Sequence, residues 1–270
     1  MINCRPSPYT LRRASNQDVR RHSKSFQTLS ILHLHHPAHT MASGDKTLIV
    51  IGSGPGIGRS VTTLFATKRY KNVALIARRA EQLKLEQKAV EETVAGVKVK
   101  TYAVDVVDSE ALLKALDDIE ARLGKPECIF YNAARVRPSE LLTHDVKDIE
   151  YDFKIHVSAL YTVTQREIPH LTELAKQDQK AMSSIVVTSS VLPQHPVPQF
   201  FALSLVKAAQ RNLVQGLSMT YASQGVHLGL INVGGQVSPE HETLNPTNIA
   251  AKAWDWFSKS REEPTFEVLI

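Results

Sequence analysis

The stretch KTLIVIGSGPGIG, residues 46–58, decides the fold of this 270-residue chain. Its first half is a continuous apolar run, and its second half carries Gly52, Gly56 and Gly58 ahead of a segment with helical spacing. Glycines at such a junction let the backbone turn tightly and let a pyrophosphate approach the N–H groups at the start of a helix. A glycine-rich loop between the first strand and the first helix of a βαβ unit is much stronger evidence than the loop alone. The stretch therefore predicts a dinucleotide-binding site.

Outward from this stretch, short apolar runs alternate with helical segments as far as residue 270. Strands separated by helices of about 10 to 15 residues indicate right-handed βαβ units, and strands with little polar alternation indicate a sheet covered on both faces. We expect an α/β fold, a Rossmann-type doubly wound parallel sheet of about seven strands in a single domain, residues 46–270. The predicted strands are 46–52, 72–77, 97–106, 126–134, 183–190, 226–234 and 266–270, and the predicted helices are 57–70, 79–94, 109–122, 147–177 (bent by Pro169), 200–223 and 246–259.

The positive charge of the chain, +5 at pH 7, is concentrated near the N-terminus. Residues 1–40 contain a single acid, Asp18, so the rest of the chain has equal numbers of basic and acidic residues. A neutral body is not typical of a nucleic-acid binder, and we expect no nucleic-acid partner. The basic residues of the N-terminal stretch are Arg5, Arg12, Arg13, Arg20, Arg21 and Lys24.

Residues 1–45 are predicted to be a basic disordered tail. Their content of Arg, Ser and His is typical of a mitochondrial transit peptide, whereas a start at Met41 is the favoured alternative and a cytoplasmic location goes with it. No run approaches the roughly 18 apolar residues of a membrane span. Four histidines in this stretch have no acid or cysteine to complete a site, so we expect no metal. They are His33, His35, His36 and His39.

The two cysteines, Cys4 and Cys128, are too few for a disulfide framework. Cys128 lies in the apolar run CIFY, which predicts a buried, reduced thiol and fits a reducing compartment.

The spacing Gly52-x-x-x-Gly56-x-Gly58, together with the segments below, resembles the short-chain dehydrogenase/reductase family. The resemblance covers nearly all of residues 46–270 in the right order. It implies that Ser53 and Ile57 in the same loop also contact the cofactor. It further implies a small-molecule substrate and a homo-oligomer, dimer or tetramer.

The end of the second predicted strand bears on the choice of cofactor. About 20 residues after the glycine loop, an acid would hold the 2′-hydroxyl of the adenosine ribose. Here the chain has Ala77, Arg78 and Arg79, and two guanidinium groups suit a 2′-phosphate. NADP(H) is therefore favoured over NAD(H), with Arg59 as a possible third cation. The alternative is that Arg78 and Arg79 only cap a strand end in solvent.

Three more positions carry the resemblance at the nucleotide site. Asp105, in VDV, matches the acid that family members place on the adenine. Asn132, in YNAA, matches the asparagine of the family's N-A-G segment, with Ala134 in place of the glycine. INVGGQV, which ends at Val237, resembles the turn beside the nicotinamide carboxamide but lacks its proline. Between Val237 and the helix near 246 there is little room for the family's substrate lid.

The catalytic segment matches only in part. The family uses a tyrosine as proton donor, a lysine that binds the nicotinamide ribose, a serine that orients the substrate oxygen and an asparagine that holds a relay water. Ser190 and Lys207 stand at the family's spacing, whereas Leu203 stands at the tyrosine position and His156 at the asparagine position. The candidate catalytic residues are Ser190, Lys207 and His156, with His195 in the following loop as a further candidate.

Each of these residues also has a structural interpretation. Ser190 could be a strand-end hydroxyl, Lys207 a solvated helix lysine, and His156 a buried side chain that only fills space.

Two functions fit this pattern. The first is an NADP(H)-dependent oxidoreductase of small-molecule metabolism, including secondary metabolism, with a displaced or unnecessary proton donor. Loss of a positioned general acid costs about 10²–10⁴-fold in rate. A substrate that is already positively charged, such as an iminium, or one with its own acidic hydroxyl avoids that cost. The alternative is a non-redox protein: a nucleotide-binding module, or the same scaffold reused for isomerisation or cyclisation.

Overall fold

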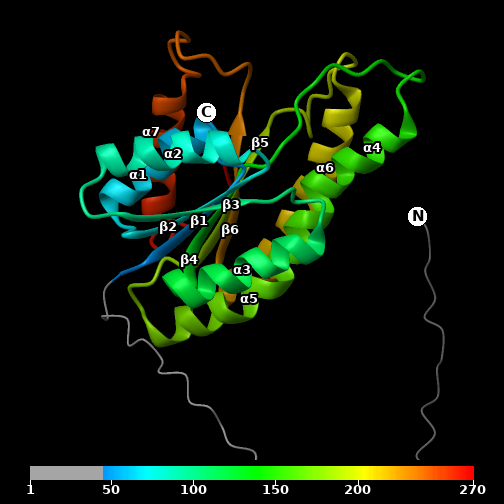
Figure 1. Cartoon of the computed structure of the whole chain (residues 1–270). Coiled ribbons are helices and arrows are strands. Elements are labelled where there is room, and N and C mark those ends of the chain that lie inside the picture. Colours follow the sequence, from blue (N-terminus) through cyan, green and yellow to red (C-terminus); the bar gives the residue numbers. More distant parts are fainter. Residues whose placement is uncertain (1–44) are drawn as a thin grey trace, which may run out of the picture. The chain divides into compact units, whose positions relative to one another are not determined.

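The computed structural model describes residues 45–270, so the predicted tail lies outside the described residues except for Asp45. Strands and helices alternate along the chain as predicted, and Figure 1 shows their arrangement. The strands are β1 (Thr47–Ile51), β2 (Asn72–Ala77), β3 (Lys98–Ala103), β4 (Pro126–Tyr131), β5 (Ser184–Ser190), β6 (His227–Val233) and β7 (Glu267–Leu269). The helices are α1 (Ile57–Lys68), α2 (Ala80–Thr93), α3 (Ser109–Leu123), α4 (Val146–Phe153), α5 (Ala159–Gln177), α6 (Phe201–Tyr221) and α7 (Pro246–Ser258), with a π-helical turn η1 (Lys154–Ser158) and a 3₁₀ turn η2 (Ala222–Gln224).

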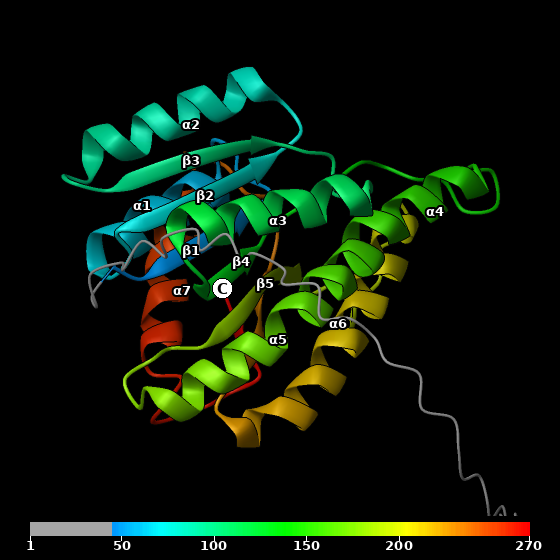
Figure 2. The same cartoon turned by 60° about the horizontal axis from the view of Figure 1, so that its bottom comes forward.

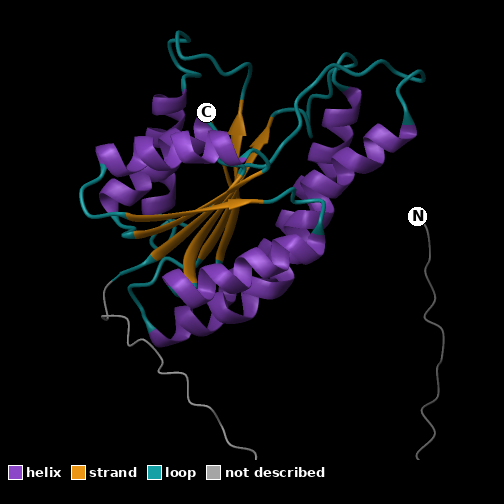
Figure 3. Ribbon diagram, viewed as in Figure 1, coloured by secondary structure: helices purple, strands orange, loops and turns teal. Residues whose placement is uncertain are grey.

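The seven strands form one parallel sheet in the order β3-β2-β1-β4-β5-β6-β7 (Figure 3). This confirms the predicted α/β fold with a doubly wound sheet. The strand order reverses at β1, which pairs with β2 on one side and β4 on the other. Ligands of open α/β sheets bind where the order reverses, outside the carboxyl ends of the strands. The topology therefore points to the loops after β1 and β4.

Both faces of the sheet are covered by helices. α1, α2 and α7 cover one face, and α3, α5 and α6 cover the other (Figures 1 and 2). Side chains of a strand alternate between the two cores: Leu48 and Val50 pack with the first group of helices, and Ile49 and Ile51 with the second. Burial of each such side chain contributes about 1.5–3 kcal/mol. The long apolar runs of the sequence are explained by this two-sided burial.

The long helix predicted at 147–177 is interrupted. α4 ends at Phe153, the π turn η1 follows, and α5 continues through Pro169 to Gln177. The departure from α-helical geometry thus lies at residues 154–158, before the proline that was expected to cause it. Side chains from elsewhere satisfy two carbonyls of this turn, since the Tyr131 hydroxyl donates to Ile155 O and Gln210 donates to His156 O.

The buried thiol, membrane spans and metal sites that the sequence analysis considered can be examined in residues 45–270. Cys128 is completely buried, and burial raises the pKa of its thiol to about 12, which confirms the expected buried thiol. Between residues 45 and 270, no helix is long and apolar enough to cross a membrane. Nor do His, Cys, Asp and Glu residues in that part of the chain gather into a group able to hold a metal ion.

A buried carboxylate joins four segments at the amino ends of the strands. Glu127 of β4 accepts hydrogen bonds from Arg69 Nε at 2.6 Å and Nη2 at 2.8 Å, from Lys46 Nζ, and from the backbone N–H of Met182. Burial raises the pKa of Glu127, but the hydrogen bonds from Arg69 and Lys46 outweigh it, so the pKa lies below its usual value. This carboxylate ties the start of β1 and the end of α1 to β4.

We expect Glu127→Gln to lower the free energy of unfolding by about 2 kcal/mol at pH 7, because two partly buried cations lose their counter-charge. The folded-state pKa of Glu127 is depressed, so its contribution is present above the unfolded pKa and is lost as pH falls through the folded value. Urea unfolding of both proteins at several pH values between 7 and 3 should show the difference shrinking toward the acid end.

The matched control is Glu110→Gln, which removes an exposed carboxylate from an i,i+4 pair with Lys114. It should change stability by less than about 0.5 kcal/mol. A Glu127 variant as stable as this control would contradict the assigned role.

Candidate nucleotide and catalytic site

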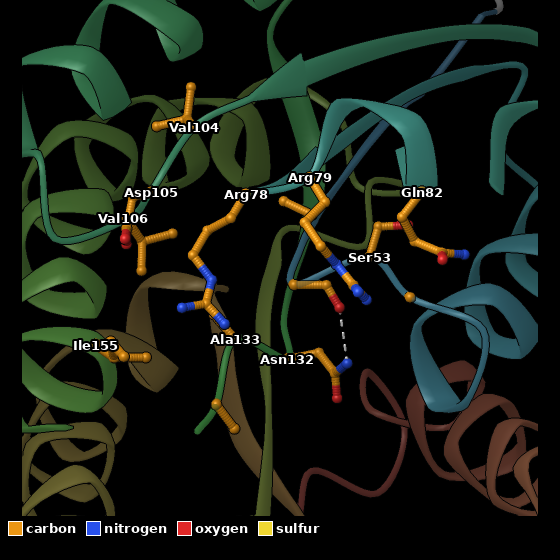
Figure 4. A pocket seen from close by; sticks show the side chains of 14 residues that line it. Ser53, Arg78, Arg79, Gln82, Val104, Asp105, Val106, Asn132, Ala133 and Ile155 are labelled. Carbon is orange, nitrogen blue, oxygen red and sulfur yellow. Dashed lines mark hydrogen bonds between the residues drawn. The ribbon is translucent and has the colours of Figure 1, made fainter. Parts of the chain in front are cut away.

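The glycine loop is locked to the end of β4. Gly52 has φ +94°, and a Cβ at this position would lie 2.4 Å from the backbone nitrogen of Ala133. Only glycine readily adopts this positive φ and also leaves room for the backbone of Ala133. The amide Nδ2 of Asn132 donates to Gly52 O at 2.9 Å, the bond drawn in Figure 4, and the Asn132 N–H donates to Ile51 O at 2.7 Å. The reversal point of the sheet is therefore a rigid junction.

A pocket of about 270 Å³ opens at this junction (Figure 4). It lies at the carboxyl ends of β1 to β4, where a dinucleotide is expected. Six of the predicted cofactor residues line it. Its lining comprises Gly52, Ser53, Gly54, Ala77, Arg78, Arg79, Gln82, Val104, Asp105, Val106, Asn132, Ala133, Ala134 and Ile155.

The start of α1 fits a phosphate group. Gly56 precedes the first residue of the helix, Ile57, and no atom lies within 4 Å of where its Cβ would stand. Gly58 is tightly packed, with a Cβ position 3.0 Å from Gly52 O. The buried hydroxyl of Ser53, which lines the pocket, has no hydrogen-bond partner in the described part of the chain. Open backbone N–H groups and an unused hydroxyl at a helix N-terminus suit an anion.

Arg78 and Arg79 form a cationic corner of the pocket. Both side chains are exposed, and in Figure 4 the Arg79 guanidinium extends toward Ser53 of the glycine loop, whereas the Arg78 guanidinium extends toward Ala133. Neither makes an ion pair with any of the residues 45–270. Arg79 is also the N-cap of α2, so the helix dipole adds to the positive field. The corner has two guanidinium groups available for an anion.

Arg59 does not belong to this corner. Its Nε and Nη2 donate to the two carboxylate oxygens of Glu86, at 2.7 and 2.9 Å, and Glu86 is completely buried. A buried carboxylate needs a paired cation, so this guanidinium is taken up inside the protein. This ion pair leaves Arg59 less available as the expected third cation for a 2′-phosphate. Gln82, which sequence reasoning missed, lines the pocket and donates to the same carboxylate.

Asp105 is held in place before any ligand binds. Its Oδ1 accepts from the Val107 N–H at 3.2 Å, and its Oδ2 accepts from the Tyr151 hydroxyl at 2.8 Å. The Arg135 guanidinium lies over the Tyr151 ring, 4.8 Å from its centroid. Neither Tyr151 nor Arg135 was predicted, because nothing in the sequence connects them with Asp105. This end of the pocket can offer one carboxylate and a flat, partly apolar wall.

Lys207 lies on the buried face of α6 and is 5% exposed. Its Nζ donates to Thr188 O at 2.7 Å and to Gln210 Oε1 at 2.8 Å, and burial lowers its pKa to about 7. Thr188 belongs to β5, which pairs with β4 next to the pocket. Lys207 is therefore not a solvated helix lysine, and it lies below the carboxyl end of β5.

Two further positions of the catalytic segment, Ser190 and Leu203, lie at the end of β5 and on α6. Ser190 ends β5, and its hydroxyl accepts from the Leu192 N–H at 3.3 Å. Leu203 is one helical turn before Lys207 and is 7% exposed, so an apolar side chain occupies the tyrosine position. No hydroxyl or acid from α6 takes the place of that tyrosine among the described residues.

His156 is completely buried in the π turn, and within residues 45–270 neither of its ring nitrogens has a partner. Burial lowers its pKa well below the usual value, and the charges of Lys207 and Arg135 lower it further. The ring is therefore neutral. This geometry offers no path from the ring to solvent, and it gives the catalytic role predicted for His156 no support.

The remaining sequence candidates lie in loops. His195 is exposed in the turn after β5, where its N–H donates to Val191 O. Val237 is half-buried after β6 and packs on the core shared with α1 and α7.

Comparison with known families matches residues 46–248 to the model of the short chain dehydrogenases. A short chain dehydrogenase of Pseudocercospora fijiensis is 32% identical over 193 residues, which are 70% of this chain and 59% of that protein. Human 17-beta-hydroxysteroid dehydrogenase 13 is 25% identical over 199 residues, 72% of this chain and 57% of that protein. The chain thus spans less than two thirds of the length of these curated relatives.

Solved structures share the fold. An apo short chain oxidoreductase from Pseudomonas aeruginosa PAO1, described as containing an atypical catalytic center, has a TM-score of 0.72 at 19% identity, covering 83% of this chain and 95% of that one. L-Sorbose reductase from Gluconobacter frateurii, solved with NADPH and L-sorbose, has a TM-score of 0.65 at 20% identity, covering 81% and 74%. Since the family model matches most of the chain, and the glycine loop, Asn132 and strand order agree with it, this protein belongs to the short-chain dehydrogenase family.

Proposed function

We propose that this protein is an NADP(H)-dependent oxidoreductase acting on a small organic molecule, without a proton donor at the position of the family's tyrosine. The observation that carries the proposal is the pocket at the strand reversal with its two unpaired guanidinium groups, Arg78 and Arg79. A phosphate on the adenosine ribose would complete two charge-assisted hydrogen-bond sites that a hydroxyl would leave unused.

Each part of the cofactor would contact a different set of residues. Gly56, Ile57 and Gly58 at the start of α1 would hold the pyrophosphate, and Ser53 would donate to it. Asp105 would face the adenine. When bound, NADP(H) supplies or accepts a hydride. Lys207 would donate its remaining N–H to the nicotinamide ribose, and Val237 would lie beside the nicotinamide.

The substrate side lacks a proton donor. Leu203 presents methyl groups where a phenol would stand, and His156 is neutral and sealed in the core. Ser190 can orient a substrate atom by a hydrogen bond, but an unassisted hydroxyl is a poor acid. We therefore propose an electrophile that needs hydride alone, such as an iminium carbon, or a substrate that carries its own acidic hydroxyl.

A non-redox protein is the second candidate, because Leu203 and His156 stand where the family's catalytic groups stand. Either a nucleotide-binding module or a scaffold for isomerisation or cyclisation would tolerate them. Steady consumption of NADPH with any substrate would exclude this candidate.

NADPH should bind at least tenfold more tightly than NADH, and Arg78→Asp should cost NADPH about 10- to 100-fold in affinity while leaving NADH nearly unchanged. Both cofactors can be titrated by their fluorescence. Lys84→Asp makes the same charge change on the exposed face of α2 and should have little effect. Equal affinities of the parent protein for the two cofactors would overturn the proposed specificity.

Leu203→Tyr should create weak reduction of simple ketones, because it places a phenol one turn before Lys207, whose charge would favour the phenolate. The double variant with His156→Asn is the fairer test, since that change restores the family's residue in the π turn. The measurement is NADPH oxidation against a panel of ketones, with the parent nearly inactive. Met219→Tyr, at an exposed position of the same helix, is the matched control.

Two results would count against this account of the missing acid. One is a parent protein that reduces ketones at ordinary enzyme rates, with His156→Ala and His195→Ala equally active. The other is a double variant that binds NADPH normally yet stays inert, which would favour the non-redox candidate.

We also propose that a second copy of the chain covers exposed apolar side chains on α4, α5 and α6. Phe153, Tyr161 and Leu205 are each about half exposed, and these helices lie on one face of the sheet (Figure 2). Sedimentation velocity should show a dimer or tetramer that Tyr161→Lys with Leu205→Glu dissociates, whereas Met219→Glu should not. A monomeric parent would contradict this assembly.

A further inference from the structure

A line of buried hydrogen bonds links three elements, β5, α6 and the π turn η1. Lys207 Nζ donates to Thr188 O of β5 and to Gln210 Oε1, and Gln210 Nε2 donates to His156 O of the π turn at 2.8 Å. Gln210 is completely buried. Its amide can stand only one way round, because the lysine can only donate and the carbonyl can only accept. Gln210 therefore fixes the position of the lysine nitrogen relative to η1.

The arrangement leaves one donor of the lysine unused. A protonated ammonium has three N–H groups, and two are taken by Thr188 O and Gln210. The third has no partner in the described part of the chain. An unpaired donor on a buried cation is costly, so a position that keeps one suits a group that is completed by a ligand.

No acid compensates the charge of Lys207. Among residues 45–270, none of the ion pairs involves Lys207. The charges of Lys207 and Arg135 both lower the pKa of the buried His156 in η1, and Arg135 is itself paired with Asp148 and Asp152. From β5 and α6, the lysine nitrogen has only uncharged hydrogen-bond partners, Thr188 O and Gln210 Oε1. Burial lowers the pKa of Lys207 to about 7, and the oxygens of Thr188 and Gln210 lie within hydrogen-bond distance of its nitrogen.

We propose that Gln210 is a positioning residue for Lys207, holding the lysine nitrogen so that its third N–H is directed at the nicotinamide ribose of the bound cofactor. The inference rests on the proposed function, in which Lys207 contacts that ribose. Because the amide spans the whole distance from Lys207 to His156 O, the side chain itself makes the connection between the lysine and the π turn.

The test separates the two halves of the cofactor. NADPH contains the nicotinamide ribose, whereas adenosine 2′,5′-bisphosphate contains only the adenosine end. Gln210→Ala should weaken NADPH binding about five- to tenfold, the effect of one misplaced hydrogen bond, and should change bisphosphate binding by less than about twofold. Gln215→Ala, an exposed glutamine on the same helix, is the control and should affect neither ligand.

A pH profile supplies a readout that a purely structural role would not change. The charge of Lys207 is present below its pKa, so the affinity for NADPH relative to the bisphosphate should fall as pH rises through about 7. Gln210→Glu places a carboxylate next to the ammonium and favours the charged form. The midpoint of the profile should then move up by about one pH unit or more. The 2′-phosphate is present in both ligands, and the bisphosphate also has a 5′-phosphate monoester. Both have a pKa of about 6, so the ratio of affinities is read above that pH.

The outcomes distinguish a failure of the positioning role of Gln210 from a failure of the proposed function. Equal weakening of both ligands by Gln210→Ala, or a profile that Gln210→Glu does not move, would overturn the positioning role and leave the proposed function standing. A parent that binds neither ligand would overturn both. If Gln210→Ala does not fold, the profile of Gln210→Glu decides the question.

Discussion

The close approach of Gly52 to the end of β4 is the contact on which the rest of the site depends. With φ +94° and no room for a Cβ beside Ala133, the loop after β1 can reach β4 only at a glycine. The bonds from Asn132 to Gly52 O and Ile51 O then hold both strand ends in register. The pocket, the start of α1 and the arginine corner are all placed relative to this junction. The site is thus built on a junction held by close backbone packing and hydrogen bonds, as a preorganised ligand site requires.

The sequence sufficed for the fold because the signals there are local. Short strand-like segments between helices predicted each of the seven strands, the inner ones as apolar runs buried on both faces, and the glycine loop predicted a dinucleotide site after the first strand. Six of the cofactor candidates line one pocket for the same reason, since the carboxyl ends of parallel strands meet at one edge. Hydrophobic periodicity does not show where a helix ends or is interrupted. The π turn at residues 154–158 was therefore not predicted.

Side-chain pairs between distant segments could not be predicted. Arg59 looked available for a phosphate until its partner, Glu86, 27 residues away, was found buried beneath it. Gln210 bonds to a carbonyl 54 residues earlier, and Tyr151 to a carboxylate 46 residues earlier. A weak signal did exist for Gln210: it follows Lys207 by three positions on a helix face that is otherwise mostly apolar. A polar residue on such a face needs a partner, although the sequence does not say which one.

The π turn also determines how this region tolerates changes in chain length. A π turn holds one residue more than an α turn, so it absorbs an extra residue without rotating the helix on either side. Loss of one residue between Lys154 and Ser158 would let α4 and α5 join as one regular helix with their apolar faces still directed at the core. The fold would survive such a deletion, but the carbonyl that receives Gln210 would be drawn back into the helix. In this chain, a single extra residue separates a helix that only packs from one that also presents a backbone carbonyl to Gln210.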